Sequence, residues 1–209
     1  MPEVKIHWNT EEQELKRVLN YLKEIEFYKQ NNYQLSLPED LGDDFQEEKI
    51  KRQVFVEYSP KKFETKLGGL QLNWKHMEKV FFEDAQTVLQ IKPLPEYECF
   101  ITQYGTGGSY NPPNVIIANI KSRFLGAYNI GHELIHLLIH DLIEKNNIDH
   151  WQKERLVDHY LFKILHVNRY QNIPESIDTK IVDEIFESYS SQGVERVIRE
   201  LNKKTLTQK

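Results

Sequence analysis

The sequence has a single cysteine, no long hydrophobic run and no excess of positive charge. Because a disulfide needs two cysteines, Cys99 cannot form one within the chain, which indicates a reducing compartment. No apolar run approaches the roughly 20 residues that span a bilayer, and the first eight residues lack the features of a signal peptide. The formal net charge of −5 argues against nucleic acid as the main partner. These absences predict a cytoplasmic protein that binds neither membranes nor nucleic acid, and they leave the oligomeric state open.

The most informative stretch is residues 129–138, which contains His132-Glu133-x-x-His136 among helix-forming residues. Histidines four residues apart lie one above the other on a helix. Both imidazoles can therefore reach one metal ion at about 2.0–2.1 Å, the bond length that zinc prefers. Glu133 lies beside that ion, where a carboxylate can act as general base toward water. The spacing predicts a zinc site with Glu133 as the catalytic residue.

A motif with only three fixed positions also arises by chance. Most accidental copies would lie in loops or on solvated helix faces. Here the residues around the histidines are apolar, and six of the eight histidines fall between His132 and His166. This clustering favours a metal site over coincidence.

A catalytic zinc site also needs a third protein ligand. Ile139 and Leu142 occupy the positions at which metzincins have glycine and histidine, so that arrangement is excluded. His140 follows His132 by eight residues, about 12 Å along a straight helix, which is too far to share one ion comfortably. We interpret His140 as a residue near the cleft or as part of a capped helix end.

A better candidate for the third ligand lies in the next predicted helix. Glu154 and Asp158 are four residues apart and therefore share a helical face. The order resembles that of the gluzincin metallopeptidases, in which a glutamate of the following helix binds the metal and an aspartate four residues later supports the first histidine. The resemblance implies these roles: metal ligands His132, His136 and Glu154, general base Glu133, and Asp158 as the partner of His132. The alternative is that Glu154 and Asp158 are solvated charges on an amphipathic helix.

The resemblance covers roughly residues 97–166 and is nearest to compact intracellular peptidases such as the ImmA/IrrE group. This chain has Val157-Asp158 where that group has Ala-Asn. The resemblance implies a zincin-like α+β fold, with a small mixed sheet, an HExxH helix and several packing helices. We expect one metallopeptidase-like domain over residues 1–209, made of N-terminal helices and a hairpin (1–95), a metal-site core (96–170) and C-terminal helices (171–209).

Local patterns in the N-terminal part predict further elements. Thr10 to Gln13 reads as a capping box that opens a helix reaching about Gln30. From Phe45 the sequence is ambiguous, helix-like at first and then β-rich. Residues 63–74 alternate apolar with polar around Gly68-Gly69, which predicts a β-hairpin. A helix is expected over residues 77–89.

In the core, residues 97–104 and 115–120 read as strands, with Cys99 packed in the first. The glycine-rich and proline-rich segment between them, Gly105–Pro113, reads as a mobile flap. If strand 115–120 lies at the sheet edge, it can bind an extended peptide as an added strand.

The C-terminal part reads as helical. Asp149 is expected to cap the helix that carries Glu154. A helical region is expected to begin at Pro174, and a last helix to end at about Leu201. Residues 202–209 read as a frayed tail.

We therefore predict a zinc-dependent metallopeptidase that hydrolyses peptide or protein substrates through a zinc-activated water, with Glu133 as general base. Five residues are candidates for stabilising the oxyanion, and the sequence favours none of them over the others: His140, His150, His159, Tyr110 and Tyr128. The main alternative is a non-catalytic zinc-binding regulatory or interaction protein with a zincin fold, whose sign would be a narrow or blocked cleft. A helical scaffold with structural histidines is a third possibility, and it predicts no stoichiometric metal.

Overall fold

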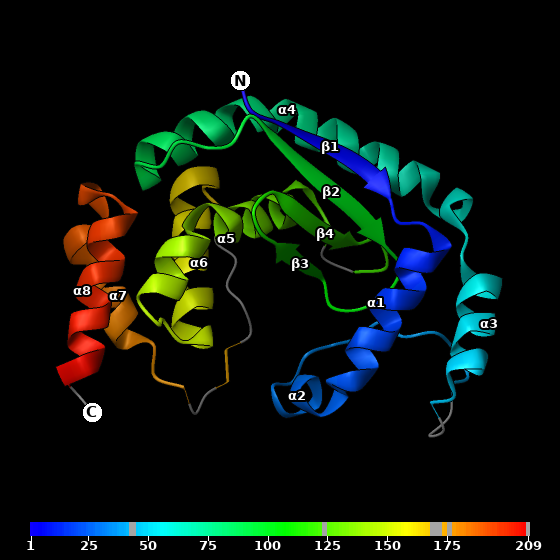
Figure 1. Cartoon of the computed structure of the whole chain (residues 1–209). Coiled ribbons are helices and arrows are strands. Elements are labelled where there is room, and N and C mark those ends of the chain that lie inside the picture. The colour runs from blue at the N-terminus through cyan, green and yellow to red at the C-terminus, as the bar shows by residue number, and fades with distance from the viewer. Residues whose placement is uncertain (42–44, 123–124, 168–172, 175–176, 208–209) are drawn as a thin grey trace.

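The computed structural model describes the chain except residues 42–44, 123–124, 168–172, 175–176 and 208–209. A small sheet is surrounded by helices (Figure 1), which confirms the expected mixed α+β class. The strands are β1 (Glu3–Trp8), β2 (Glu96–Thr102), β3 (Gly108–Asn111) and β4 (Val115–Asn119). The α-helices are α1 (Glu11–Lys23), α2 (Ile25–Gln30), α3 (Glu47–Glu57), α4 (Glu64–Leu89), α5 (Ala127–Lys145), α6 (His150–Leu165), α7 (Lys180–Tyr189) and α8 (Val194–Thr207). Two short 3-10 turns, Pro60–Phe63 and Ser190–Gln192, precede α4 and α8.

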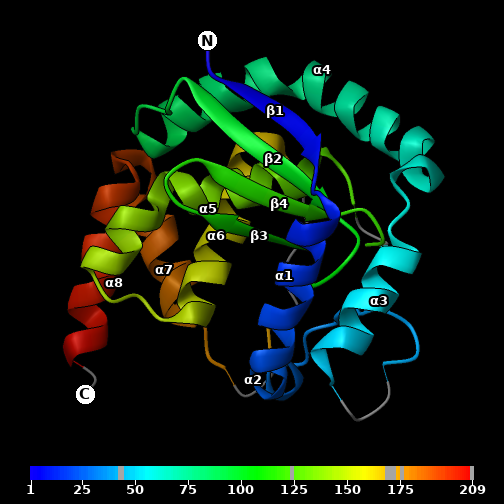
Figure 2. The same ribbon diagram turned by 45° about the vertical axis from the view of Figure 1, so that its right-hand side comes forward.

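The four strands lie in the order β1-β2-β4-β3, as Figure 2 shows. β1, β2 and β4 are parallel, and β3 runs antiparallel to β4. Because β4 lies between β2 and β3, strand 115–120 does not meet the condition for binding a peptide as an added strand, which is a place at the sheet edge. β3 forms that edge, and it arises from the segment that reads as a flap. Its four residues are too few for an alternating pattern, so only pairing with β4 identifies it as a strand.

The predicted hairpin over residues 63–74 is wrong, because Phe63 ends a 3-10 turn and residues 64–74 lie in the first half of the 26-residue helix α4. Apolar residues recur at spacings of four and three and form one stripe against the larger core: Phe63, Leu67, Leu70, Trp74, Met77 and Phe81. A stripe with this period is helical, and it contains the short alternation that imitates a strand. Gly68 and Gly69 lie on the open side, where an added Cβ would meet no atom within 4 Å. Burial of the stripe outweighs the cost of two helical glycines, about 1 kcal/mol each.

The N-terminal part departs from expectation at two more places. Residues 3–8 form β1, where Val4, Ile6 and Trp8 pack toward the core on alternate positions. The ambiguous segment after Phe45 is helical throughout as α3, with β-branched residues packed on its buried face. In both segments the packing partner, rather than local preference, determines the structure.

Two hydrophobic clusters hold these elements together. The larger one contains residues of β2, β4 and α4 to α8, and Cys99 is fully buried in it as expected. The smaller one joins α1 and α3 to Tyr104, which follows β2. Helix α5 contacts β3 and β4 of the sheet, and it also contacts helices α4, α6 and α8. The helix that carries the HExxH motif is therefore packed between the sheet and other helices.

The helix ends give a mixed result. The capping box at Thr10 is confirmed, with Gln13 N donating to the Thr10 hydroxyl and Thr10 N donating to Gln13 Oε1. Helix α1 ends at Lys23, and the separate helix α2 completes the segment to Gln30. The expected tail is wrong up to Thr207, where α8 ends, and the helix expected from Pro174 begins only at Lys180. The rest of the predicted tail, 208–209, lies outside the described residues. Among the described helices, none has the length and apolar character needed to cross a membrane.

Candidate metal centre

Helices α5 and α6 pack closely at the residue that precedes the motif. A Cβ on Gly131 would lie 3.0 Å from Leu165 on α6 and 3.2 Å from Phe81 on α4. The absence of a side chain at Gly131 therefore permits the close contact of the three helices. Asp149 begins α6 as predicted, its carboxylate accepting hydrogen bonds from the main-chain nitrogens of Trp151 and Gln152. The first turn of α6 is thus held where Glu154 faces α5.

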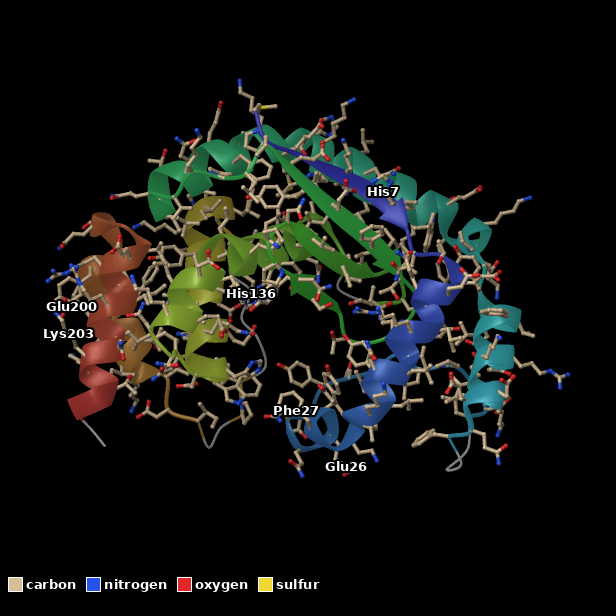
Figure 3. All side chains as sticks on the ribbon, viewed as in Figure 1. His7, Glu26, Phe27, His136, Glu200 and Lys203 are labelled. Atoms are coloured by element: carbon tan, nitrogen blue, oxygen red, sulfur yellow. The ribbon has the colours of Figure 1, made fainter. Side chains whose placement is uncertain are left out.

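The structure brings the three predicted ligands together in the interior. His132 Nε2 and His136 Nε2 lie 3.0 Å apart. Glu154 Oε2 lies 3.5 Å from the first nitrogen and 3.3 Å from the second. Figure 3 shows His136 near the centre of the molecule, between the sheet and α6. Among the described residues, these three form the one group of histidine, cysteine or carboxylate side chains close enough to hold a metal ion.

The size of this triangle fits a tetrahedral metal ion. Ligands about 2.0–2.1 Å from a tetrahedral ion stand about 3.3–3.4 Å from one another. The three sides here are 3.0, 3.3 and 3.5 Å. Two imidazoles and one carboxylate are a donor set that zinc accepts, and other divalent transition metals accept it too. The residues present therefore fit a small divalent ion, and their geometry alone does not select zinc.

The two histidines are oriented in different ways. Asp158 is buried beside His132, with its Oδ1 3.9 Å from His132 Nδ1. This places Asp158 on the side predicted for it, at a separation longer than a hydrogen bond. The Nδ1 atom of His136 is buried and has no hydrogen-bond partner among the residues that the structure describes. Instead, the ring of Tyr110 from β3 stacks on His136, with ring centroids 4.8 Å apart and planes 7° from parallel. Stacking therefore fixes the second imidazole.

Glu133 points toward the edge of the sheet. Its carboxylate lies against Gly108 at the start of β3, and any side chain at Gly108 would collide with it. Burial raises the pKa of Glu133 to about 7. The predicted general base thus lies between the triangle of His132, His136 and Glu154 and the edge strand.

The electrostatics of the cluster favour a positive charge at its centre. Burial acts to lower the pKa of His132, but the carboxylates of Glu154, Glu133 and Asp158 outweigh it and raise that pKa. Burial also acts to raise the pKa of Glu154, yet the neighbouring histidines hold it well below its usual value. For His136 burial prevails and lowers the pKa to about 4. A neutral imidazole beside an ionised carboxylate is the state in which both can bind a metal.

Of the residues that the sequence offered as possible oxyanion-stabilising groups, some lie near the triangle and others do not. His150 lies near the triangle, with Nδ1 3.9 Å from Glu154 Oε1. His140 contacts the Tyr110 ring and is not among the ligand group. His159 instead bonds Asp183, and Tyr128 is exposed.

The structure adds a residue that sequence reasoning did not identify. The hydroxyl of Tyr33 lies 2.6 Å from His150 Nε2, and its ring stacks on Trp151. The segment after α2 is thereby joined to the start of α6, more than a hundred residues later. No local pattern around Tyr33 indicates this contact, because it depends entirely on the tertiary arrangement.

Comparisons of this chain with protein-family models, with curated proteins and with solved structures found no match.

Proposed function

We propose that this protein is a zinc-dependent metallopeptidase. The observation that carries the proposal is the triangle of His132, His136 and Glu154, with Glu133 directly beside it. Two histidines and a carboxylate leave one position of a tetrahedral ion open, as catalytic zinc sites do.

The chain's own residues divide the chemistry between them. Zinc bound in this site would act as a Lewis acid, polarising the scissile carbonyl and acidifying water. Glu133 takes the proton from the attacking water and passes it to the leaving amine. Tyr110 and Asp158 restrict the two imidazoles, so that the ligand atoms keep their spacing. The residues His132, Glu133, His136 and Glu154 are each at most 8% exposed, and this burial keeps bulk water away from the charges.

The edge strand β3 favours a peptide over a small molecule as substrate. Asn119 N donates a hydrogen bond to Gly107 O, so these two residues form a hydrogen-bonded pair of β4 and β3. Hydrogen-bonded and non-hydrogen-bonded pairs alternate along an antiparallel ladder. The main-chain groups of Ser109 and Asn111 therefore face β4 as well. Those of Gly108 and Tyr110 therefore face the open edge of the sheet. Among the described residues, the Thr106 hydroxyl is the only side chain that bonds this edge, at the Gly108 carbonyl. An extended peptide can pair here, beside Glu133, as an added strand.

The test is the substitution Glu133→Gln, assayed on a mixture of denatured-protein peptides by mass spectrometry. We expect bound zinc and the fold to be retained and hydrolysis to fall by about 10²–10⁴-fold, because the general base is removed. Glu144→Gln is the matched control, since Glu144 is an exposed carboxylate at the end of the same helix. Equal hydrolysis by wild type and Glu133→Gln would refute the mechanism.

The low exposure of the site favours a second candidate, a zinc-binding regulatory protein that cleaves nothing. The Tyr33 to His150 contact joins two distant segments close to Glu154 and would restrict access. In that case wild type and Glu133→Gln would bind equal amounts of zinc, and neither would produce new peptide ends.

A further inference from the structure

We propose that a basic groove on the outer face of the sheet selects substrates with acidic side chains at alternate positions. This inference rests on the proposed pairing of a peptide with β3. It adds the chemical class of the substrate, and it concerns the face of the sheet opposite to the metal centre.

The groove lies between α1 and the outer face of the strands, and it has a volume of about 680 Å³. Its floor is apolar and contains Phe100, Val115 and Ile117 from β2 and β4. Ser109 and Asn111 of β3 form one border. Helix α1 forms the other, and Figure 2 shows it beside the ends of β4 and β3. The groove therefore runs along the same strand that borders the metal centre.

The two faces of β3 serve the two sites. Gly108 and Tyr110 turn toward Glu133 and His136 on the inner face. Ser109 and Asn111 turn outward into the groove. Side chains of an added strand alternate in the same way and lie beside those of their neighbour. Every second side chain of a paired peptide therefore lies beside Ser109 and Asn111 at the border of the groove, while the peptide's other face meets the metal centre.

The charge at this border is positive. Lys16, Arg17 and Lys23 line the groove from α1, and Glu24 is the single acidic residue among its lining. Among the described residues, the Arg17 guanidinium donates to neutral oxygens, those of Tyr104, Tyr21 and Ser109. Within the described part of the chain, no carboxylate lies within 4.0 Å of these three cations.

Arg17 is also in the right place to meet a ligand. It lies 3.2 Å from the Ser109 hydroxyl, and a side chain paired beside Ser109 would come within reach of its guanidinium. A chain of net charge −5 whose described residues place no carboxylate within 4.0 Å of three cations along one groove offers a site for an acidic partner. A carboxylate side chain of the substrate matches this charge and accepts two hydrogen bonds from arginine.

The test measures binding separately from cleavage. Zinc-loaded Glu133→Gln protein is titrated into fluorescein-labelled peptides, and anisotropy is recorded. One probe alternates Ala and Glu. A second has the same composition with all Glu in one block, and a third alternates Ala and Gln. We expect the alternating Glu peptide to bind about tenfold more tightly than either of the others, with a preference that declines as salt is added.

Two substitutions assign the preference to the groove. Arg17→Gln should reduce the preference for the alternating Glu peptide most. The double variant Lys16→Gln with Lys23→Gln also removes positive charge from the groove, and both lysines are exposed, so their replacement should not disturb the packing. Lys75→Gln is the control, because Lys75 is an exposed cation on α4, away from the groove. The groove variants should lose most of the preference, and the control should keep it.

The outcomes separate this inference from the proposed function. Hydrolysis that needs Glu133, together with equal binding of the three peptides, would overturn the groove proposal and leave the peptidase intact. An absence of hydrolysis, with the alternating Glu peptide still preferred and the preference lost in the groove variants, would support the groove and refute the peptidase. A preference that survives in both groove variants would overturn the groove proposal.

Discussion

Helix α6 carries two clusters of carboxylate and imidazole on different faces, and the two clusters differ in what they bring together. On one face, Asp183 of α7 accepts hydrogen bonds from Arg155 Nε at 2.7 Å and Nη2 at 3.1 Å, and it lies 2.7 Å from His159 Nε2. That cluster contains its own cation and is partly exposed, with 33% of the Asp183 side chain accessible. In this cluster the charge of the Asp183 carboxylate is paired with that of the Arg155 guanidinium.

On the other face, Glu154 and Asp158 meet the two histidines of α5, with Glu133 nearby. In the described part of the chain, Lys153 is the one lysine or arginine that forms an ion pair there, at 3.7 Å from Glu154 Oε1. Glu154 Oε2 lies within 3.5 Å of the Nε2 atoms of both histidines, and among the described residues only this group brings three possible metal ligands together. The contrast shows why one cluster is suited to a metal ion and the other only to holding two helices together.

The largest effect is expected from removing a ligand. His136→Ala and Glu154→Ala should reduce zinc from about one ion per chain to nearly none, because two ligands do not hold the ion in competition with buffer. His159→Ala should keep its zinc, since His159 belongs to the other face of α6. Elemental analysis of the purified proteins measures the zinc content. Equal zinc in all three variants would contradict the assignment of the metal site to His136 and Glu154.

A smaller effect is expected at Asp158, which does not belong to the ligand triangle. Asp158→Asn removes the charge beside His132 Nδ1 while keeping the size of the side chain. We expect zinc affinity to fall by about 10–100-fold, as for other residues that orient a ligand. Competition with a chromophoric chelator measures the affinity. An unchanged affinity would show that packing alone orients His132.

The Asp183 cluster should affect stability without affecting zinc. Asp183→Asn should lower the free energy of unfolding by about 1–2 kcal/mol, because hydrogen bonds to a charged group are lost at a partly exposed site. Urea denaturation of the wild type and the variant gives this difference, and the zinc content of the two should be equal.

The same cluster should respond to acid. Burial acts to raise the pKa of Asp183, but the hydrogen bonds from Arg155 and His159 lower it below its usual value. The stabilisation is therefore fully present above the unfolded pKa of about 3.9 and is lost as the pH falls through the lower folded pKa. The stability difference between wild type and Asp183→Asn should shrink below about pH 4. A constant difference at all pH values would contradict this account.

The smallest change in the free energy of unfolding is expected at two glycines of α4 that lie away from both clusters. Gly68→Ala and Gly69→Ala should each raise the free energy of unfolding by about 0.5–1 kcal/mol, because both glycines are in a helix and have open space for a methyl group. Zinc content and hydrolysis should not change. Destabilisation by either substitution would instead favour a turn at this position.

Sequence by itself determined the residues that carry charge and imidazole, and their spacing along each helix. His132 and His136 share a face of α5, and Glu154 and Asp158 share a face of α6, because a helix converts a spacing of four into adjacency. The capping residues Thr10 and Asp149 were also readable, since a cap depends on a few neighbouring residues. Local rules were sufficient at these positions.

Only the tertiary structure decided how distant segments meet. It made residues 63–74 part of a helix, because a core stripe of six side chains outweighs two glycines. It placed β3 rather than β4 at the edge, because pairing, not composition, orders a sheet. It also brought Tyr110 onto His136 and Arg17 to Ser109, contacts between segments that share no local pattern. The candidate metal-ligand set follows the periodicity of two helices, whereas the surroundings that we propose to select a substrate come from long-range packing.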